Sequence, residues 1–261
     1  MKVLVLGAGK MIESILTGLK ISEDLSQWSI YSPSGVSAQR LAHKVGAQWV
    51  STLDSISKPD WVIIGCKPQQ LQDLATSLQG RFHDALYISI LAAASESHQL
   101  KILGIKKLVR VMPNLPVAFR KGISLLASSS VNEELKQVKL LFGMLGEAPI
   151  VTENELDELT LLTGSGPALF YEFTSLLAAS FSSLSKEERE VLARKVLLGA
   201  AMAATHDSKP LSDLIDAVTS KGGVTIAVLN EWRKESLDQL ISKGITAGKA
   251  RSLEIKSILQ S

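Results

Sequence analysis

The sequence predicts an α/β domain with a doubly wound parallel sheet, followed by a domain made only of helices. Three observations lead to this prediction. Strand-like runs alternate with helical patterns over the first half, a glycine turn follows the first run, and strand patterns disappear from about residue 153. We therefore expect a first domain over residues 1–152 and a second over residues 153–261.

Composition narrows the class of protein before any motif is considered. The 261 residues suffice for two domains of ordinary size, and 46% hydrophobic with 21% charged residues is typical of a soluble globular protein. The net charge is +2 and the sequence has no run of basic residues, so nothing in its charge indicates binding to nucleic acid or to an anionic membrane. The single cysteine, Cys66, fits a reducing compartment, and the four histidines are too scattered to suggest a metal site. We expect a cytoplasmic protein with no metal and no membrane or nucleic-acid partner.

The first strand-like run, residues 2–6, leads directly into a glycine turn and a helical pattern. Strand, glycine turn and helix form the context that a dinucleotide-binding fingerprint requires. Gly7 permits the tight turn, and Gly9 lets the backbone approach a pyrophosphate at the helix N-terminus. Ile12 replaces the third glycine of the fingerprint, so we expect it to push helix and strand apart or to force local repacking.

The alternation continues to about residue 151. The expected strands are residues 28–31, 47–50, 61–66, 86–90, 108–111 and 122–127, and the expected helices between them include residues 36–45, 69–78 and 96–103. Two prolines frame Asn114, which predicts a rigid loop over residues 112–116 rather than a strand. Asn132 is expected to cap a helix that runs to Leu145 and stops at Gly146.

The end of the second strand bears on the choice of cofactor. An acid at this position binds the ribose and selects NAD, but the sequence here is Tyr-Ser-Pro-Ser, without an acid. Ser32 and Ser34 could instead donate to a 2′-phosphate, with Arg40 or Lys44 nearby on the following helix. An ordinary Ser-Pro turn is the alternative. We expect NADPH to be preferred over NADH.

The second half is helical. Residues 169–181 are apolar on nearly all sides, which is typical of a helix buried in a large core or against another subunit. Ser185 and Glu188 form a capping box that opens a long helix, and Pro210 starts a further one.

Thr219–Thr225 lies between two of these helical patterns and contains the adjacent glycines Gly222 and Gly223. A loop that ends in a new helix offers unpaired N–H groups at a positive dipole end, which can hold a carboxylate. A helix corner with capping hydroxyls is the alternative interpretation.

Three motifs, in order and spacing, make the chain similar to the pyrroline-5-carboxylate reductases over essentially its whole length. They are residues 110–114, 164–168 and 219–225, and residues 7–11 and 67–69 add to the likeness. The resemblance implies a Rossmann domain that binds NAD(P)H, then an all-α domain that forms homodimers, often within higher assemblies. It also implies hydride transfer to the C=N carbon of 1-pyrroline-5-carboxylate, which gives L-proline.

The resemblance also assigns roles to residues of this sequence. The pyrophosphate would be cradled by Gly7, Ala8, Gly9, Lys10 and Met11, and the 2′-phosphate would meet Ser32 and Ser34. The nicotinamide and its ribose would be lined by Cys66, Lys67 and Ala92. The substrate carboxylate would be held by backbone N–H groups of the loop that contains Ser220, Gly222, Gly223, Val224 and Thr225. The Thr225 hydroxyl would lie near the ring nitrogen as the catalytic group.

Several positions depart from the family's pattern and leave other functions open. A glycine is expected at Ala93, a threonine at Leu115 and a proline at Lys221, where the chain brings a charge to the substrate loop. One alternative is a non-catalytic paralogue that binds NADP. Another is a related imine or β-hydroxyacid reductase, although the helix region 169–185 lacks the lysine that β-hydroxyacid dehydrogenases carry there.

Overall fold

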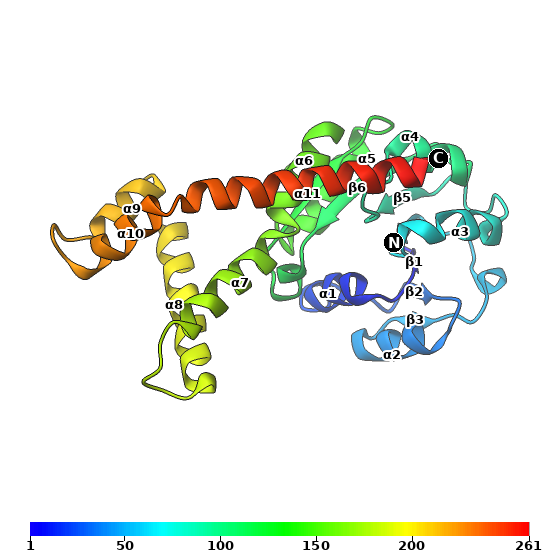
Figure 1. Ribbon diagram of the computed structural model, residues 1–261. Helices are drawn as coiled ribbons and strands as arrows, with labels where there is room; N and C mark the ends of the chain where they lie inside the picture. The colour runs from blue at the N-terminus through cyan, green and yellow to red at the C-terminus, as the bar shows by residue number, and fades with distance from the viewer. Residues whose placement is uncertain (261) are drawn as a thin grey trace. The chain divides into compact units, whose positions relative to one another are not determined.

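The computed structural model describes residues 1–260, without the side chains of residues 259 and 260 (Figure 1). The chain divides into two compact units. The first contains residues 1–165 together with 249–260, and the second contains Gly166–Gly248. Within the described residues, no helix combines the length and apolar character that a membrane span requires.

The first unit is built on one eight-stranded sheet with the strand order β3-β2-β1-β4-β5-β6-β7-β8. The first six strands are parallel, β7 runs antiparallel to β6, and β8 is parallel to β7. The order 3-2-1-4-5-6 is that of the Rossmann fold, so the predicted doubly wound sheet is confirmed. The strands are β1 (Val3–Leu6), β2 (Trp28–Tyr31), β3 (Gln48–Trp49), β4 (Trp61–Ile64), β5 (Leu86–Ser89), β6 (Leu108–Pro113), β7 (Gly122–Ala127) and β8 (Gly146–Glu147).

Helices cover both faces of this sheet because its central strands are apolar on both sides. Val3 and Val5 of β1 pack with α1 (Lys10–Leu19), α2 (Val36–Val45) and α5 (Glu133–Gly143) in one core cluster. Leu4 and Leu6 point to the opposite face and pack with α3 (Leu71–Leu78) and α4 (Glu96–Leu103) in another. Because helices cover both faces of β1, all four of its residues are apolar and the strand forms a continuous apolar run in the sequence.

Several expected boundaries were wrong, including those near Pro113 and Gly146. Met112 and Pro113 belong to β6 rather than to a loop. Proline is tolerated in this strand because β5 pairs with β6 only as far as Arg110, so the missing N–H of Pro113 removes no hydrogen bond between these two strands. The helix expected to run to Leu145 ends at Gly143, and Gly146 opens β8. Short 3₁₀ turns lie at Leu53–Ser55, Pro68–Gln70 and Leu115–Phe119.

The second unit contains helices only, as the sequence predicted. They are α7 (Gly166–Ala179), α8 (Lys186–His206), α9 (Leu211–Ala217), α10 (Val224–Lys234) and most of α11 (Leu237–Gln260). The predicted capping box is present, since the Ser185 hydroxyl accepts from the N–H of Glu188 at 3.3 Å and donates to its carboxylate at 2.8 Å. Phe173 and Trp232 pack edge to face within this unit, with ring centroids 5.8 Å apart.

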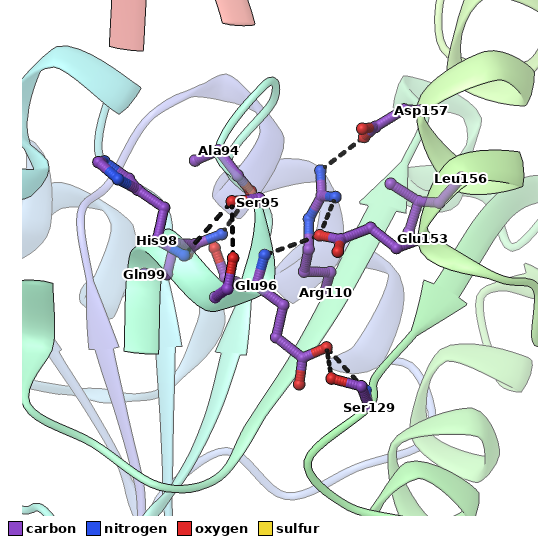
Figure 2. A network of polar contacts seen from close by, with 12 residues as sticks. Ala94, Ser95, Glu96, His98, Gln99, Arg110, Ser129, Glu153, Leu156 and Asp157 are labelled. Atoms are coloured by element: carbon purple, nitrogen blue, oxygen red, sulfur yellow. Dashed lines mark hydrogen bonds and ion pairs between the residues drawn. The ribbon is translucent and has the colours of Figure 1, made fainter. Parts of the chain in front are cut away.

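Helix α6 (Glu153–Thr163) belongs to the first unit and not to the second. The buried Arg110 of β6 donates to Glu153 at 2.7 Å and to Asp157 at 2.9 Å, at the beginning of the helix (Figure 2). Asn114 donates to the carbonyl of Thr163 at 2.9 Å, at its end. Arg110 of β6 and Asn114, the residue after this strand, therefore hold the two ends of α6. These contacts explain why the compact units divide the chain differently from the predicted boundary at 152/153.

The last residues of α11 join the first unit through the same helix. Lys249 contacts Glu158 and Lys256 contacts Asp157, each at 2.8 Å. The Asp157 carboxylate thus accepts hydrogen bonds from both Arg110 and Lys256. Burial of its carboxyl opposes ionisation, but these two cations outweigh burial and lower its pKa.

Candidate functional site

The residues expected to bind a dinucleotide all follow strands of the first unit at their carboxyl ends. Strands β2, β1, β4 and β5 are neighbours in the sheet, so the turns after them line one edge. The strand order reverses between β1 and β4, and ligands of open α/β sheets bind beside such a reversal. The sheet therefore gathers the predicted turns at one edge: residues 7–11, Ser32 with Ser34, Cys66 with Lys67, and Ala92.

The glycine turn after β1 has the geometry that a pyrophosphate needs. Gly7 has a φ of 111°, and a Cβ there would lie 2.7 Å from the carbonyl oxygen of Gly65. A Cβ on Gly9 would meet no atom within 4 Å, so this residue leaves open space beside the backbone. Gly9 is also the N-cap of α1, and no side chain caps the helix. The free N–H groups at this helix end fit a dinucleotide phosphate.

Ile12 is accommodated by local repacking, as one of the two expected outcomes, and the partner is Gly65. Ile12 is 1% exposed and belongs to the core cluster that includes α1 and β4. A Cβ on residue 65 would overlap Cγ1 and Cδ1 of Ile12. The glycine missing from the fingerprint is thus compensated by a glycine at the end of the neighbouring strand.

We expect Gly65→Ala to destabilise the fold by about 1–3 kcal/mol, because it overpacks a closed core. Ile12→Ala is expected to cost about 2–5 kcal/mol for the cavity that it leaves. The double variant should lose less than the sum, by roughly 1–2 kcal/mol, since the new methyl group occupies part of that cavity. Urea unfolding of the four proteins measures this coupling, and additive losses would contradict the pairing. Gly9→Ala is the matched control, because it should weaken dinucleotide binding without loss of stability.

Three hydroxyls rather than the two predicted lie together after β2, two in the turn and one in α2. Ser37 Oγ lies 3.2 Å from Ser32 Oγ and 3.4 Å from Ser34 Oγ. Sequence reasoning missed Ser37 because it stopped at the Ser-Pro-Ser motif. Its position in the first turn of α2 could have indicated it, since hydroxyls that precede a helix and those of its first turn lie close together.

Cys66 and Lys67 follow β4. Burial raises the pKa of the Cys66 thiol to about 11, which favours its protonated form, and the side chain packs against the core cluster on the α3 and α4 face of the sheet. Lys67 is exposed at the start of the Pro68–Gln70 turn, and its backbone N–H donates to Gln70. Its ammonium is accessible to a ligand at this edge.

Ala93 has a left-handed backbone, with a φ of 61°, at the position where a glycine was expected after β5. This conformation costs an L-residue roughly 1–2 kcal/mol. We expect Ala93→Gly to stabilise the protein by about 0.5–1 kcal/mol, because relief of this strain exceeds the entropy that a glycine loses. Thermal unfolding measures it. The neighbouring Ala92 lacks a positive φ, and Ala92→Gly should not stabilise.

The loop Thr219–Thr225 of the second unit has the features expected of an anion seat. The N–H of Gly223 donates to the carbonyl of Ser220 at 2.9 Å, and Gly222 takes a φ of 74°. Gly223 is the N-cap of α10 without a side-chain cap. The alternative with capping hydroxyls is therefore not what this helix end contains, and its first N–H groups are free for a carboxylate.

The side chains of this loop differ in their engagement. The Thr219 hydroxyl donates to the carbonyl of Ile215 at 2.6 Å, whereas Thr225 is exposed and its hydroxyl makes no hydrogen bond within residues 1–260. Lys221 is exposed, and no ion pair involves it in the described part of the chain. The second predicted motif, residues 164–168, joins α6 to α7 and contributes no charged side chain.

Comparisons with known proteins agree on one family. A family model described as pyrroline-5-carboxylate reductase dimerisation matches residues 153–255, and one described as NADP oxidoreductase, coenzyme F420-dependent, matches residues 2–93. The pyrroline-5-carboxylate reductase of Pisum sativum is 31% identical over 96% of this chain and 94% of its own length. That of Pasteurella multocida is 30% identical over 97% of both chains. The solved reductase of Coxiella burnetii superposes with a TM-score of 0.85 at 26% identity, over 97% of each chain.

Proposed function

Because this chain belongs to the pyrroline-5-carboxylate reductase family, we propose that it reduces the C=N bond of 1-pyrroline-5-carboxylate to L-proline with NADPH. The observation that most supports this substrate is the uncapped start of α10 behind Gly222 and Gly223. It provides backbone donors for one carboxylate and, one residue into the helix, the free hydroxyl of Thr225.

In the proposed reaction the bound NADPH supplies the hydride. The free N–H groups at the start of α1 hold the pyrophosphate, and Lys67 and Ala92 line the nicotinamide side of the cofactor. The free N–H groups of Val224 and Thr225, at the start of α10, hold the substrate carboxylate and so fix the ring. The Thr225 hydroxyl donates toward the ring nitrogen and relays a proton from water, which makes the imine carbon more electrophilic.

Steady-state oxidation of NADPH with 1-pyrroline-5-carboxylate tests the proposal. We expect turnover, with a higher kcat/KM for NADPH than for NADH. Binding of NADPH without turnover would favour a non-catalytic paralogue. Turnover only with a β-keto or aldehyde acid would instead favour a related dehydrogenase.

We also propose that the protein is cytoplasmic, because its single cysteine fits a reducing compartment.

We further propose that the chain forms a homodimer through α7 and α8. Both helices expose large apolar side chains in the single chain, among them Phe170, Leu176 and Val196 at 60%, 60% and 63%. The exposure of so many large apolar side chains on two helices is typical of a protein–protein interface. Light scattering should give twice the mass of the chain, and Leu176→Asp should give the monomer. Leu140→Asp, at a still more exposed position on α5 of the first unit, is the control that should remain dimeric.

A further inference from the structure

One face of α2 carries a hydroxyl and two cations in succession. Ser37, Arg40 and Lys44 are spaced at i, i+3 and i+7, which places them along one side of the helix. The hydroxyl of Ser37 lies with those of Ser32 and Ser34 at the N-terminal end of this face. Hydroxyls alone carry no charge, whereas a ribose 2′-phosphate is a dianion near neutral pH, so a cation is needed for strong discrimination.

Glu13 of α1 distinguishes the two cations. Lys44 Nζ donates to Glu13 Oε1 at 2.7 Å, and this hydrogen bond is the main reason that the pKa of Glu13 is lowered. Arg40 Nη2 lies 3.9 Å from Glu13 Oε2, beyond hydrogen-bond distance, and its side chain is 73% exposed. An exposed ion pair of this length contributes little to stability. The Lys44 ammonium is therefore held by its hydrogen bond to Glu13. The Arg40 guanidinium makes only a weak ion pair, so it can contact a ligand with little loss of stability.

Arg40 is also the better partner for a phosphate. Its planar guanidinium presents a fork of N–H donors that matches two phosphate oxygens, whereas an ammonium acts as a point charge. We propose that Arg40, and not Lys44, supplies the positive charge that selects NADP over NAD, with Ser37 as the third hydroxyl of the 2′-phosphate seat. The proposal rests on the NADP binding proposed above and names the residues that determine it.

The two nucleotides 2′,5′-ADP and 5′-AMP differ only in the 2′-phosphate, so their dissociation constants isolate its contribution. Titration calorimetry on the wild type, Arg40→Gln and Lys44→Gln compares two variants that each remove one positive charge from the same helix face. We expect Arg40→Gln to weaken 2′,5′-ADP binding about 10–100-fold, the range of a charge-assisted contact, and to leave 5′-AMP within about twofold. Lys44→Gln should change the ratio by less than about threefold. The salt dependence of 2′,5′-ADP binding should fall only in Arg40→Gln.

The outcomes separate this proposal from the proposed function. A wild type that prefers 2′,5′-ADP, with that preference unchanged in Arg40→Gln or lost in Lys44→Gln, would overturn the role of Arg40 and leave NADP binding intact. A wild type that binds both nucleotides equally would overturn the NADP preference and the role of Arg40 together. Ser37→Ala should reduce the preference in the same direction by a smaller factor, about 3–10-fold, as expected for a neutral hydrogen bond.

Discussion

Thr225→Ala is expected to lower the turnover number for 1-pyrroline-5-carboxylate by about 10–10³-fold, the range for one lost donor to a developing charge. The physical reason is the position of the hydroxyl. It lies in the same first turn of α10 as the N–H groups proposed to hold the carboxylate, and it makes no hydrogen bond within the described residues. A donor that is free in the unliganded chain can be directed to the substrate without breaking an internal bond.

Thr219→Ala is the matched control for this variant. It removes the same chemical group from the other end of the same loop, but the Thr219 hydroxyl is bonded to the carbonyl of Ile215. We expect kcat to change by less than about threefold, a range that corresponds to the modest net value of one internal hydrogen bond. Thr225→Ser keeps the donor and should retain most of the activity.

The split between kinetic constants sharpens the test. Loss of a donor that acts in the transition state lowers kcat and kcat/KM together, whereas loss of a carboxylate contact raises KM with kcat unchanged. A Thr225→Ala variant with normal kcat and raised KM would keep the residue in substrate binding and remove it from catalysis. Unchanged kinetics would remove it from both.

Much of the fold was predictable because the signals are local. A strand, a glycine turn and a helix follow one another within residues 2–19, and α2 and α4 begin and end where their apolar spacing predicts. The carboxyl-end loops could be identified for the same reason, since parallel strands place every second connection at one edge of the sheet. Local patterns also located the loop before α10.

What escaped prediction depends on partners distant in sequence. The accommodation of Ile12 required knowledge that Gly65 lies against it, and no periodicity shows that contact. The hydrogen bond from Lys44 to Glu13, which lies 31 residues away in sequence, likewise depends on how α1 and α2 pack. The sequence showed residues 110–114 only as a motif shared with a family. In the structure these residues hold α6, and the groups that they contact lie 43 to 49 residues further along the chain.

Arg110→Met is expected to destabilise the first unit by about 3–5 kcal/mol, the cost of leaving partly buried carboxylates without their cation. The arginine side chain is 2% exposed and reaches Glu153 and Asp157 with separate nitrogens, as Figure 2 shows. The Glu153 carboxylate also accepts a hydrogen bond from the N–H of Glu96 at 2.7 Å. If Glu153 moves when Arg110 is replaced, the start of α4 is disturbed as well. Urea unfolding of the purified variant measures the loss.

Lys256→Met removes one positive charge from the other oxygen of the same Asp157 carboxylate and serves as the control. This lysine is 32% exposed, and water can replace it, so a loss of about 1 kcal/mol or less is expected. A similar loss in both variants would mean that the buried arginine has no special role in attaching α6.

The effect of Arg110→Met should depend on pH in a defined direction. The pKa of Asp157 is lower in the folded protein than its ordinary value, so this carboxylate stabilises the fold above about pH 4, and the contribution is lost as the pH falls through the folded pKa. The difference in unfolding free energy between wild type and variant should therefore be largest at neutral pH and shrink in acid. A difference that stays constant down to pH 3 would assign the loss to the packing of the arginine side chain rather than to its charge.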